Sequence, residues 1–103
     1  MTQHDLVVLS LASHREWRRG YELERQVVGK ESIGSEADTR LYELFNKRVP
    51  EAGETTRKIN GDTYTIETKK EGTARLWRAY LSSKKPQQRV IQLPNGSVRL
   101  EYA

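Results

Sequence analysis

The 103-residue chain has no cysteine, which excludes disulfide bonds and any metal site built on thiolates. Its two histidines, His4 and His14, are too few to build a histidine metal site, so we expect no metal. We also expect no cofactor, because the function predicted below works by contacts alone. No run approaches the roughly 18 consecutive apolar residues that a membrane-spanning helix needs. The N-terminal stretch MTQHDLVVLSLASH carries an acidic residue where a secretory signal carries basic ones, so we expect a cytoplasmic protein.

Charge is unevenly distributed along the chain, whose net charge is +4. Residues 1–54 carry a net charge of −2, whereas residues 55–103 carry +6. A basic half attracts polyanions such as nucleic acids, but the same pattern also occurs as a solvated surface with no partner.

Hydrophobic residues make up 35% of the chain and include two Trp and five Tyr, which predicts one folded domain with a modest core.

The N-terminal segment has the pattern of a buried helix. Thr2 is followed three residues later by Asp5, as in a capping box, and residues 6–12 are almost all apolar. This predicts a helix from Thr2 to about Ser13, although the same run also permits a buried strand. Trp17 follows among charged residues, and its size predicts an anchor between elements of the core.

Two further helical patterns follow. Leu23 and Val27 lie four residues apart and predict a short second helix that ends at a left-handed Gly29. The stretch 35–48 predicts the third helix, because Ser35 precedes Asp38 by three residues in the manner of a capping box. Its apolar positions share one face and are Ala37, Leu41, Leu44 and Phe45.

The second half has the period-two alternation of strands. Residues 63–81 predict a β-hairpin whose tip, 69–73, carries two lysines and a glycine. A small strand at 56–59 precedes it across the Asn-Gly turn at 60–61. A second hairpin is expected at 90–102, around the turn sequence Pro-Asn-Gly.

The order of these elements resembles the winged helix-turn-helix family of small prokaryotic and viral regulators. The stretches that carry the resemblance are WRRGYEL (17–23), IGSEADTRLYELF (33–45) and IETKKEGTARLWRAYL (66–81). The resemblance implies an α+β winged helix, with a three-helix helix-turn-helix core and a β-hairpin wing. We therefore expect a winged-helix domain at 1–82 and an additional C-terminal β-hairpin at 83–103, packed on the same domain.

The resemblance also implies a function, which is sequence-specific binding of double-stranded DNA by a small transcriptional regulator that is not an enzyme. The third helix would enter the major groove, and the wing would lie along the DNA backbone. The implied base-reading residues are Thr39, Arg40, Glu43 and Asn46. The implied backbone contacts are Arg18, Arg19, Lys30, Ser35, Lys47, Lys69, Lys70, Thr73 and Arg75.

The resemblance to winged-helix proteins also implies which partners this protein binds. We expect double-stranded DNA and neither a membrane nor a small-molecule substrate, and a homodimer would add specificity to a short site read by one helix. An adaptor that binds another protein is the alternative, because the third helix is close to charge-neutral and the last hairpin is an addition to the family pattern. Catalysis is not expected, since no motif gives the neighbouring Ser10, Ser13 and His14 a partner acid.

Overall fold

The computed structural model describes residues 1–85, 88–92, 94, 96 and 98–102 and shows an α+β fold. Its helical segments are α1 (Gln3–His14), the 3-10 turn η1 (Gly20–Leu23), α2 (Ala37–Leu44) and the 3-10 turn η2 (Ser82–Lys84). Its strands are β1 (Val27–Val28), β2 (Glu31–Ser32), β3 (Ala52–Ile59), β4 (Asp62–Glu71), β5 (Ala74–Leu81), β6 (Gln88–Gln92) and β7 (Val98–Tyr102). None of the described helices is long and apolar enough to cross a membrane.

The predicted first helix is confirmed as α1, including its capping box. The Thr2 hydroxyl accepts a hydrogen bond from the Asp5 amide at 3.2 Å, and the Asp5 carboxylate accepts one from the Thr2 amide at 3.4 Å. The same carboxylate accepts a hydrogen bond from Arg57 Nε at 2.6 Å, which ties the start of α1 to β3. Burial raises the pKa of Asp5, but the Arg57 guanidinium and the Thr2 hydrogen bonds outweigh burial and hold the pKa below its usual value.

The predicted second helix is wrong. Gly20–Leu23 form one 3-10 turn, after which Glu24 is extended and Arg25 has a left-handed φ of 62°. Val27–Val28 then pair antiparallel with β2 across a tight turn in which Gly29 has a φ of 64°. Two apolar positions four residues apart are weak evidence for a helix, and the β-branched valine pair beside a glycine favours a strand and turn instead.

The predicted third helix forms as α2 but is shorter than residues 35–48. Its N-cap residue is Glu36 and not Ser35, and no side chain caps it. The helix ends at Leu44, well before Pro50, because Asn46 and Lys47 have left-handed φ angles of 56° and 62°. A left-handed residue cannot continue a right-handed helix.

The expected α+β class is confirmed, but the expected three-helix winged-helix core is wrong. In the described part of the chain, two α-helices accompany a three-stranded antiparallel sheet of order β3-β4-β5. The predicted hairpin of 63–81 is present as β4 and β5, and the turn at Asn60-Gly61 joins β3 to β4. β3 begins at Ala52 instead of residue 56, so it is a full third strand and not a short addition.

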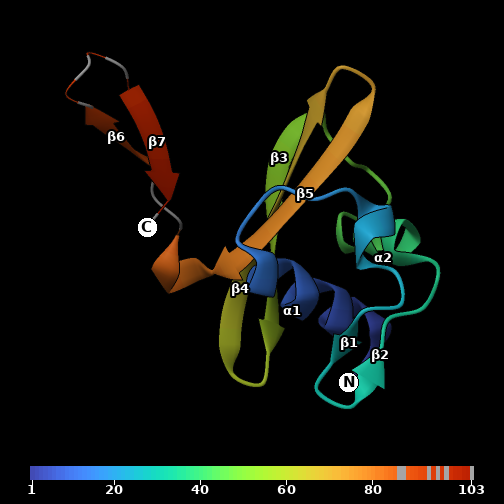
Figure 1. The fold of residues 1–103 in the computed structure, drawn as a ribbon. Helices are drawn as coiled ribbons and strands as arrows, with labels where there is room; N and C mark the ends of the chain where they lie inside the picture. Colours follow the sequence, from blue (N-terminus) through green and yellow to red (C-terminus); the bar gives the residue numbers. More distant parts are fainter. Residues whose placement is uncertain (86–87, 93, 95, 97, 103) are drawn as a thin grey trace.

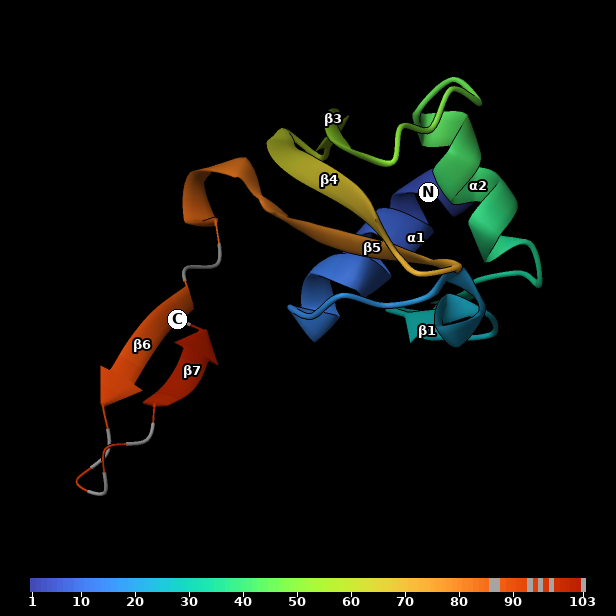
Figure 2. The ribbon, with the colours of Figure 1, turned by 90° about the horizontal axis from the view of Figure 1, so that it is seen from above.

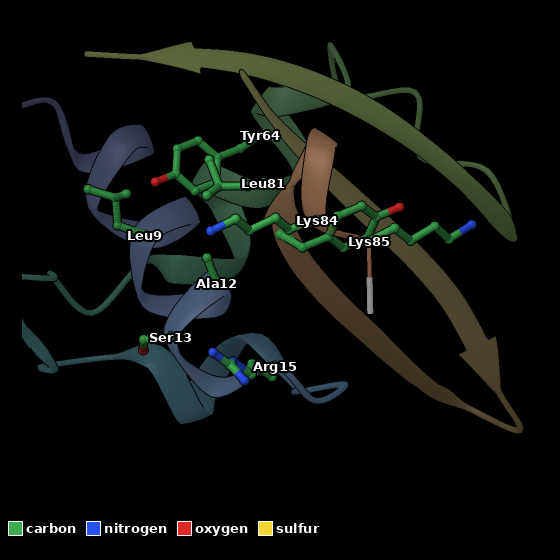
Figure 3. Close-up of a pocket in the computed structure, with 9 residues that line it drawn as sticks. Leu9, Ala12, Ser13, Arg15, Tyr64, Leu81, Lys84 and Lys85 are labelled. Carbon is green, nitrogen blue, oxygen red and sulfur yellow. The ribbon is translucent and has the colours of Figure 1, made fainter. Parts of the chain in front are cut away.

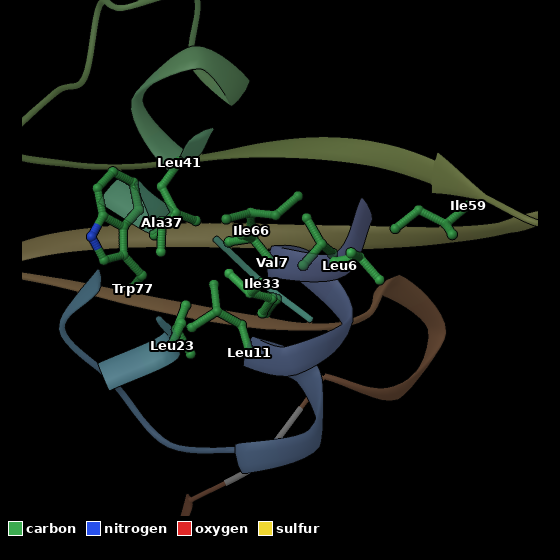
Figure 4. Packing of buried hydrophobic residues seen from close by; sticks show 12 residues of the cluster. Leu6, Val7, Leu11, Leu23, Ile33, Ala37, Leu41, Ile59, Ile66 and Trp77 are labelled. Atoms are coloured by element: carbon green, nitrogen blue, oxygen red, sulfur yellow. The ribbon is translucent and has the colours of Figure 1, made fainter. Parts of the chain in front are cut away.

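Both α-helices pack on one face of this sheet, as Figures 1 and 2 show. Alternate residues of β4 and β5, including Ile66, Trp77 and Ala79, point to that face and are completely buried. They meet Leu6, Val7 and Leu11 of α1 and Leu41 of α2 (Figure 4). Among the described residues, neither α1 nor α2 covers the opposite face of the sheet, where Thr65 hydrogen-bonds to Ser82 of η2 at 2.7 Å.

Trp77 joins three separate segments of the chain. Its backbone exchanges two hydrogen bonds of 2.8 Å with Arg18, so the segment before η1 lies along β5. Its indole Nε1 donates a hydrogen bond to Asp38 Oδ1 of α2 at 3.3 Å. The Tyr42 and Trp77 rings pack in a T-shaped arrangement, with 5.5 Å between the ring centroids. Gly20 leaves room for this arrangement, because a Cβ at residue 20 would overlap the Asp38 carboxylate.

The second predicted hairpin is present as β6 and β7, which pair in a separate two-stranded sheet. Gln88 pairs with Tyr102 and Gln92 with Val98. In Figure 1 the hairpin follows η2 beyond the end of β5. Parts of the predicted turn, residues 93, 95 and 97, lie outside the described residues, and the packing of 83–103 on the same domain stays a prediction.

Substituting Gly20→Ala should destabilise the protein by about 1–3 kcal/mol, because the new methyl group must displace the Asp38 carboxylate from the Trp77 indole. Urea unfolding followed by tryptophan fluorescence measures the change. Gly34→Ala is the matched control, since the nearest atom to a Cβ there is Gln3 Oε1 at 3.8 Å. The Gly20→Ala/Asp38→Ala double variant should lose less stability than the two single losses added together, and strict additivity would contradict the overlap.

Candidate nucleic-acid interface

The candidate interface consists of α2, the turn that follows it, and the tip of the β4–β5 hairpin. Arg75 near the tip donates hydrogen bonds to the Pro50 carbonyl at 2.6 Å and the Glu51 carbonyl at 3.4 Å. It also donates to the Thr68 hydroxyl at 3.2 Å. The chain leaving α2 is therefore fixed to the hairpin near its tip, while the Trp77 hydrogen bond to Asp38 holds α2 against the middle of β5. Figure 2 shows α2 and the hairpin from above.

The four predicted base-reading residues do not share one environment. The Arg40 guanidinium binds Glu36 at 3.1 Å and Glu43 at 2.7 Å, and Glu43 also contacts His4 of α1 at 3.2 Å. Arg40 and Glu43 are therefore half-buried in an ion-pair network between α2 and α1. Thr39 and Asn46 are exposed and are open to a partner.

The hairpin tip presents one lysine to solvent and uses the other internally. Lys69 Nζ lies 4.5 Å from the centroid of the Trp17 ring and 3.7 Å from the Glu71 carboxylate. Lys70 is exposed and has no ion-pair partner among the described residues. Thr73 is exposed beside Gly72, whose φ of 61° closes the turn. Only Lys70 of the two lysines is thus free of competing contacts on the described part of the chain.

The other predicted backbone contacts are scattered. Arg18 is paired with Glu16 at 3.2 Å and Glu22 at 3.6 Å. Arg19 is exposed next to η1, and Lys30 and Ser35 are exposed on the β1–β2 side of the molecule. Arg75 serves the protein's own loop through the hydrogen bonds described above. Lys47 is exposed in the turn after α2, where the structure adds a cation that the sequence analysis left out, the exposed Arg48.

Sequence patterns also missed a charged and aromatic cluster on the sheet face that neither α1 nor α2 covers. The buried Arg78 guanidinium binds Glu67 at 2.7 Å and lies 4.7 Å from the Trp17 ring and 5.6 Å from the Tyr80 ring. Burial, followed by the nearby Glu67 carboxylate, raises the pKa of Tyr80 to about 12. Trp17 is half-buried, and its ring is in contact with the cationic groups of Lys69 and Arg78. The tryptophan that is fully buried in the core is Trp77. Strand alternation predicts the sheet face on which each side chain lies, but it does not predict these ion-pair and cation–π contacts.

A surface cavity lies elsewhere on the molecule. It measures about 590 Å³ and opens between the C-terminal half of α1 and the end of β5 (Figure 3). Its lining residues are Leu9, Ala12, Ser13, Arg15, Tyr64, Tyr80, Leu81, Lys84 and Lys85. None of the predicted DNA contacts lines it, so the cavity and the candidate interface are separate parts of the molecule.

The residues that came nearest to a catalytic pattern have structural contacts. Ser10 donates a hydrogen bond to Gln26 Oε1 at 2.5 Å, and His14 Nε2 lies 2.9 Å from the same oxygen. Gln26 in turn donates to the Glu22 carbonyl at 2.6 Å. This network joins α1 to the segment after η1. Across the described residues, no three His, Asp or Glu side chains gather closely enough to hold a metal ion.

Comparisons with known proteins give no family for this chain. No family model, curated protein or solved structure matches it. Geometry and charge are therefore the only basis for assigning it a function.

Arg75→Ala should lower the free energy of unfolding by about 1–3 kcal/mol, because the Pro50 and Glu51 carbonyls lose a charged donor. Lys70→Ala is the control, because Lys70 lies directly opposite Arg75 in the β4–β5 pair but is exposed, and its loss should change stability by less than about 0.5 kcal/mol. Thermal and urea unfolding check both values. Equal stability of the two variants would show that Arg75 does not fix the loop.

Proposed function

We propose that this protein binds double-stranded DNA in a sequence-dependent manner, through a surface that we call the α2–hairpin surface. Its residues are Thr39, Tyr42, Asn46, Lys47, Arg48, Lys70 and Thr73. The observation that carries the proposal is the position of Lys47, Arg48 and Lys70. These exposed cations have no acidic partner among the described residues, and they come from two segments that the Arg75 hydrogen bonds hold together.

The proposed division of roles follows from exposure and charge. Lys47, Arg48 and Lys70 would contact phosphates and supply the salt-dependent part of the affinity. Thr39 and Asn46 carry hydroxyl and amide groups that can pair with base edges in a groove. The Arg40 guanidinium is already bound by two carboxylates, so a DNA contact from Arg40 would first have to break those ion pairs.

A small protein with such a surface would act by occupying its DNA site. The described residues offer a rigid contact surface on a helix and a hairpin, and the proposed role is that of a small transcriptional regulator. Its rigidity comes from the Trp77 and Arg75 contacts, which fix α2 and the hairpin relative to each other. Fixed spacing between phosphate contacts is what sets the register of a protein on a duplex.

The variant Lys47→Ala/Lys70→Ala should weaken binding to all duplex sequences alike. It should also lower the slope of log affinity against log salt by about two, because two phosphate contacts are lost. Fluorescence anisotropy with a labelled mixed-sequence duplex at several salt concentrations measures both effects. Lys84→Ala/Lys85→Ala removes the same charge at the cavity beyond the end of β5 and is the matched control. Equal losses in the two double variants would mean that only net charge matters.

Asn46→Gly should relax sequence preference while leaving the fold intact, because glycine accepts the φ of 56° at this position. The expected loss of discrimination between the preferred site and a mismatched site corresponds to about 1–3 kcal/mol. Arg40→Ala should change the preference less, since its guanidinium is held by Glu36 and Glu43. Selection from a random duplex library, repeated for each variant, measures the preference. A larger effect of Arg40→Ala than of Asn46→Gly would contradict the assignment.

A protein partner is the second candidate function, and one observation favours it. The Tyr21 side chain of η1 and the Val27 side chain of β1 are 59% and 65% exposed, and exposed aromatic side chains are enriched at protein–protein interfaces. Neither residue belongs to the α2–hairpin surface. Absence of duplex binding even at low salt would exclude the DNA proposal and leave these residues as the first candidates for a protein contact.

A further inference from the structure

β3 is an edge strand with one free side. It pairs with β4 over its whole length, from Ala52 opposite Lys69 to Ile59 opposite Asp62, and no other described strand pairs with it. The register runs without a bulge. The eight residues AGETTRKI contain no proline. Bulges and prolines are two devices by which proteins protect an edge from further pairing, and β3 has neither; its exposed Glu54 and Lys58 disfavour only a strand that lacks complementary charges.

The turn that follows β3 shows which backbone groups face the open side. Asn60 and Gly61 both have positive φ angles, 50° and 87°, which is the geometry of a two-residue type I′ hairpin turn. Such a turn makes Ile59 and Asp62 a hydrogen-bonded pair, and pairs of this kind alternate along an antiparallel ladder. The N–H and C=O groups of Glu54, Thr56 and Lys58 therefore point away from β4, toward solvent.

The side chains of these three residues are also exposed. Their outward backbone groups have no hydrogen-bond partner in the part of the chain that the structure describes. The intervening Arg57 does not block the edge, because its side chain lies on the other face of β3 and is held by Asp5 at 2.6 Å. An antiparallel strand can thus approach along the whole of 54–58.

We infer that β3 pairs with β3 of a second copy of this chain, antiparallel and with the two-fold axis at Thr56. In this register Glu54 of each copy lies directly opposite Lys58 of the other copy, and Thr56 lies opposite itself. Opposite charges placed directly across a ladder stabilise strand pairing. The three residues that face each other are those whose backbone groups point outward, so each pair exchanges two backbone hydrogen bonds.

The sequence of β3 favours this register over its neighbours. An axis at Glu54 places the two glutamates opposite each other, and an axis at Lys58 does the same to the two lysines. An axis at residue 55 or 57 leaves Glu54 without Lys58 as its partner. Like charges directly opposite each other are destabilising, so only the axis at Thr56 pairs both charges with their opposites.

The resulting dimer is a continuous six-stranded sheet of order β5-β4-β3-β3-β4-β5. A two-fold axis perpendicular to the sheet keeps α1 and α2 of both copies on the same face. The interface shares no residue with the α2–hairpin surface, so it does not depend on the proposed DNA binding. Because Glu54 and Lys58 of one strand complement Lys58 and Glu54 of a second copy, a second copy of β3, and not an arbitrary peptide, is the expected partner of the edge.

Sedimentation velocity across a concentration series tests the dimer. The wild-type protein should approach twice the 11.9 kDa mass of one chain. Glu54→Lys alone and Lys58→Glu alone should each weaken dimerisation on the order of tenfold or more, because each places like charges opposite each other twice. An equimolar mixture of the two single variants should form a heterodimer, and the Glu54→Lys/Lys58→Glu double variant should regain the homodimer.

Thr56→Pro provides an independent test. Proline removes the outward N–H but leaves the ladder to β4 intact, so this variant should fold and remain monomeric. Circular dichroism and thermal unfolding confirm that each variant folds. A wild-type protein that stays monomeric at every concentration overturns the inference. So does a dimer that Thr56→Pro leaves unchanged, or a mixture of the charge variants that fails to associate.

Discussion

The contact between the Trp77 indole and the Asp38 carboxylate is the constraint on which the arrangement of this protein depends. Trp77 is fully buried and its Nε1 has Asp38 Oδ1 as its partner at 3.3 Å, which fixes α2 against β5. The contact requires a residue without a side chain at position 20, so it also sets the path of η1. A buried polar group without a partner is costly, and this is why one hydrogen bond positions three segments.

Positive charge in this protein has two different uses. Several arginines are committed to internal contacts: Arg57 to Asp5, Arg78 to Glu67, and Arg75 to backbone carbonyls. The planar guanidinium, with its several donors, suits such positions better than an ammonium group does. The exposed cations of the proposed DNA surface are in the turn after α2 and at the hairpin tip. The proposed phosphate contacts therefore lie beyond the C-terminal end of α2 and at the hairpin tip, while Thr39 on the first turn of α2 belongs to the base-reading part of the surface.

Local rules predicted the elements that are stabilised locally. The capping box of Thr2 and Asp5 gave the start of α1, and the Asn60-Gly61 turn gave the β3–β4 connection, because both depend on residues close in sequence. The second helix failed because Arg25 and Gly29 take left-handed angles that redirect the chain into β1 and β2. The winged-helix expectation failed with it, since that fold needs three helices and the described chain has two α-helices.

The sequence by itself determined the alternation of the sheet, the capped first helix and the excess of positive charge in the second half, because these follow from composition and from spacing along the chain. Tertiary structure alone decided which charges remain available. Arg40 and Glu43 were predicted as base readers on a helical face, yet they bind each other, and Glu43 also contacts His4. The open edge of β3 is likewise a tertiary feature, because a strand has a free edge only once its neighbours in the sheet are fixed.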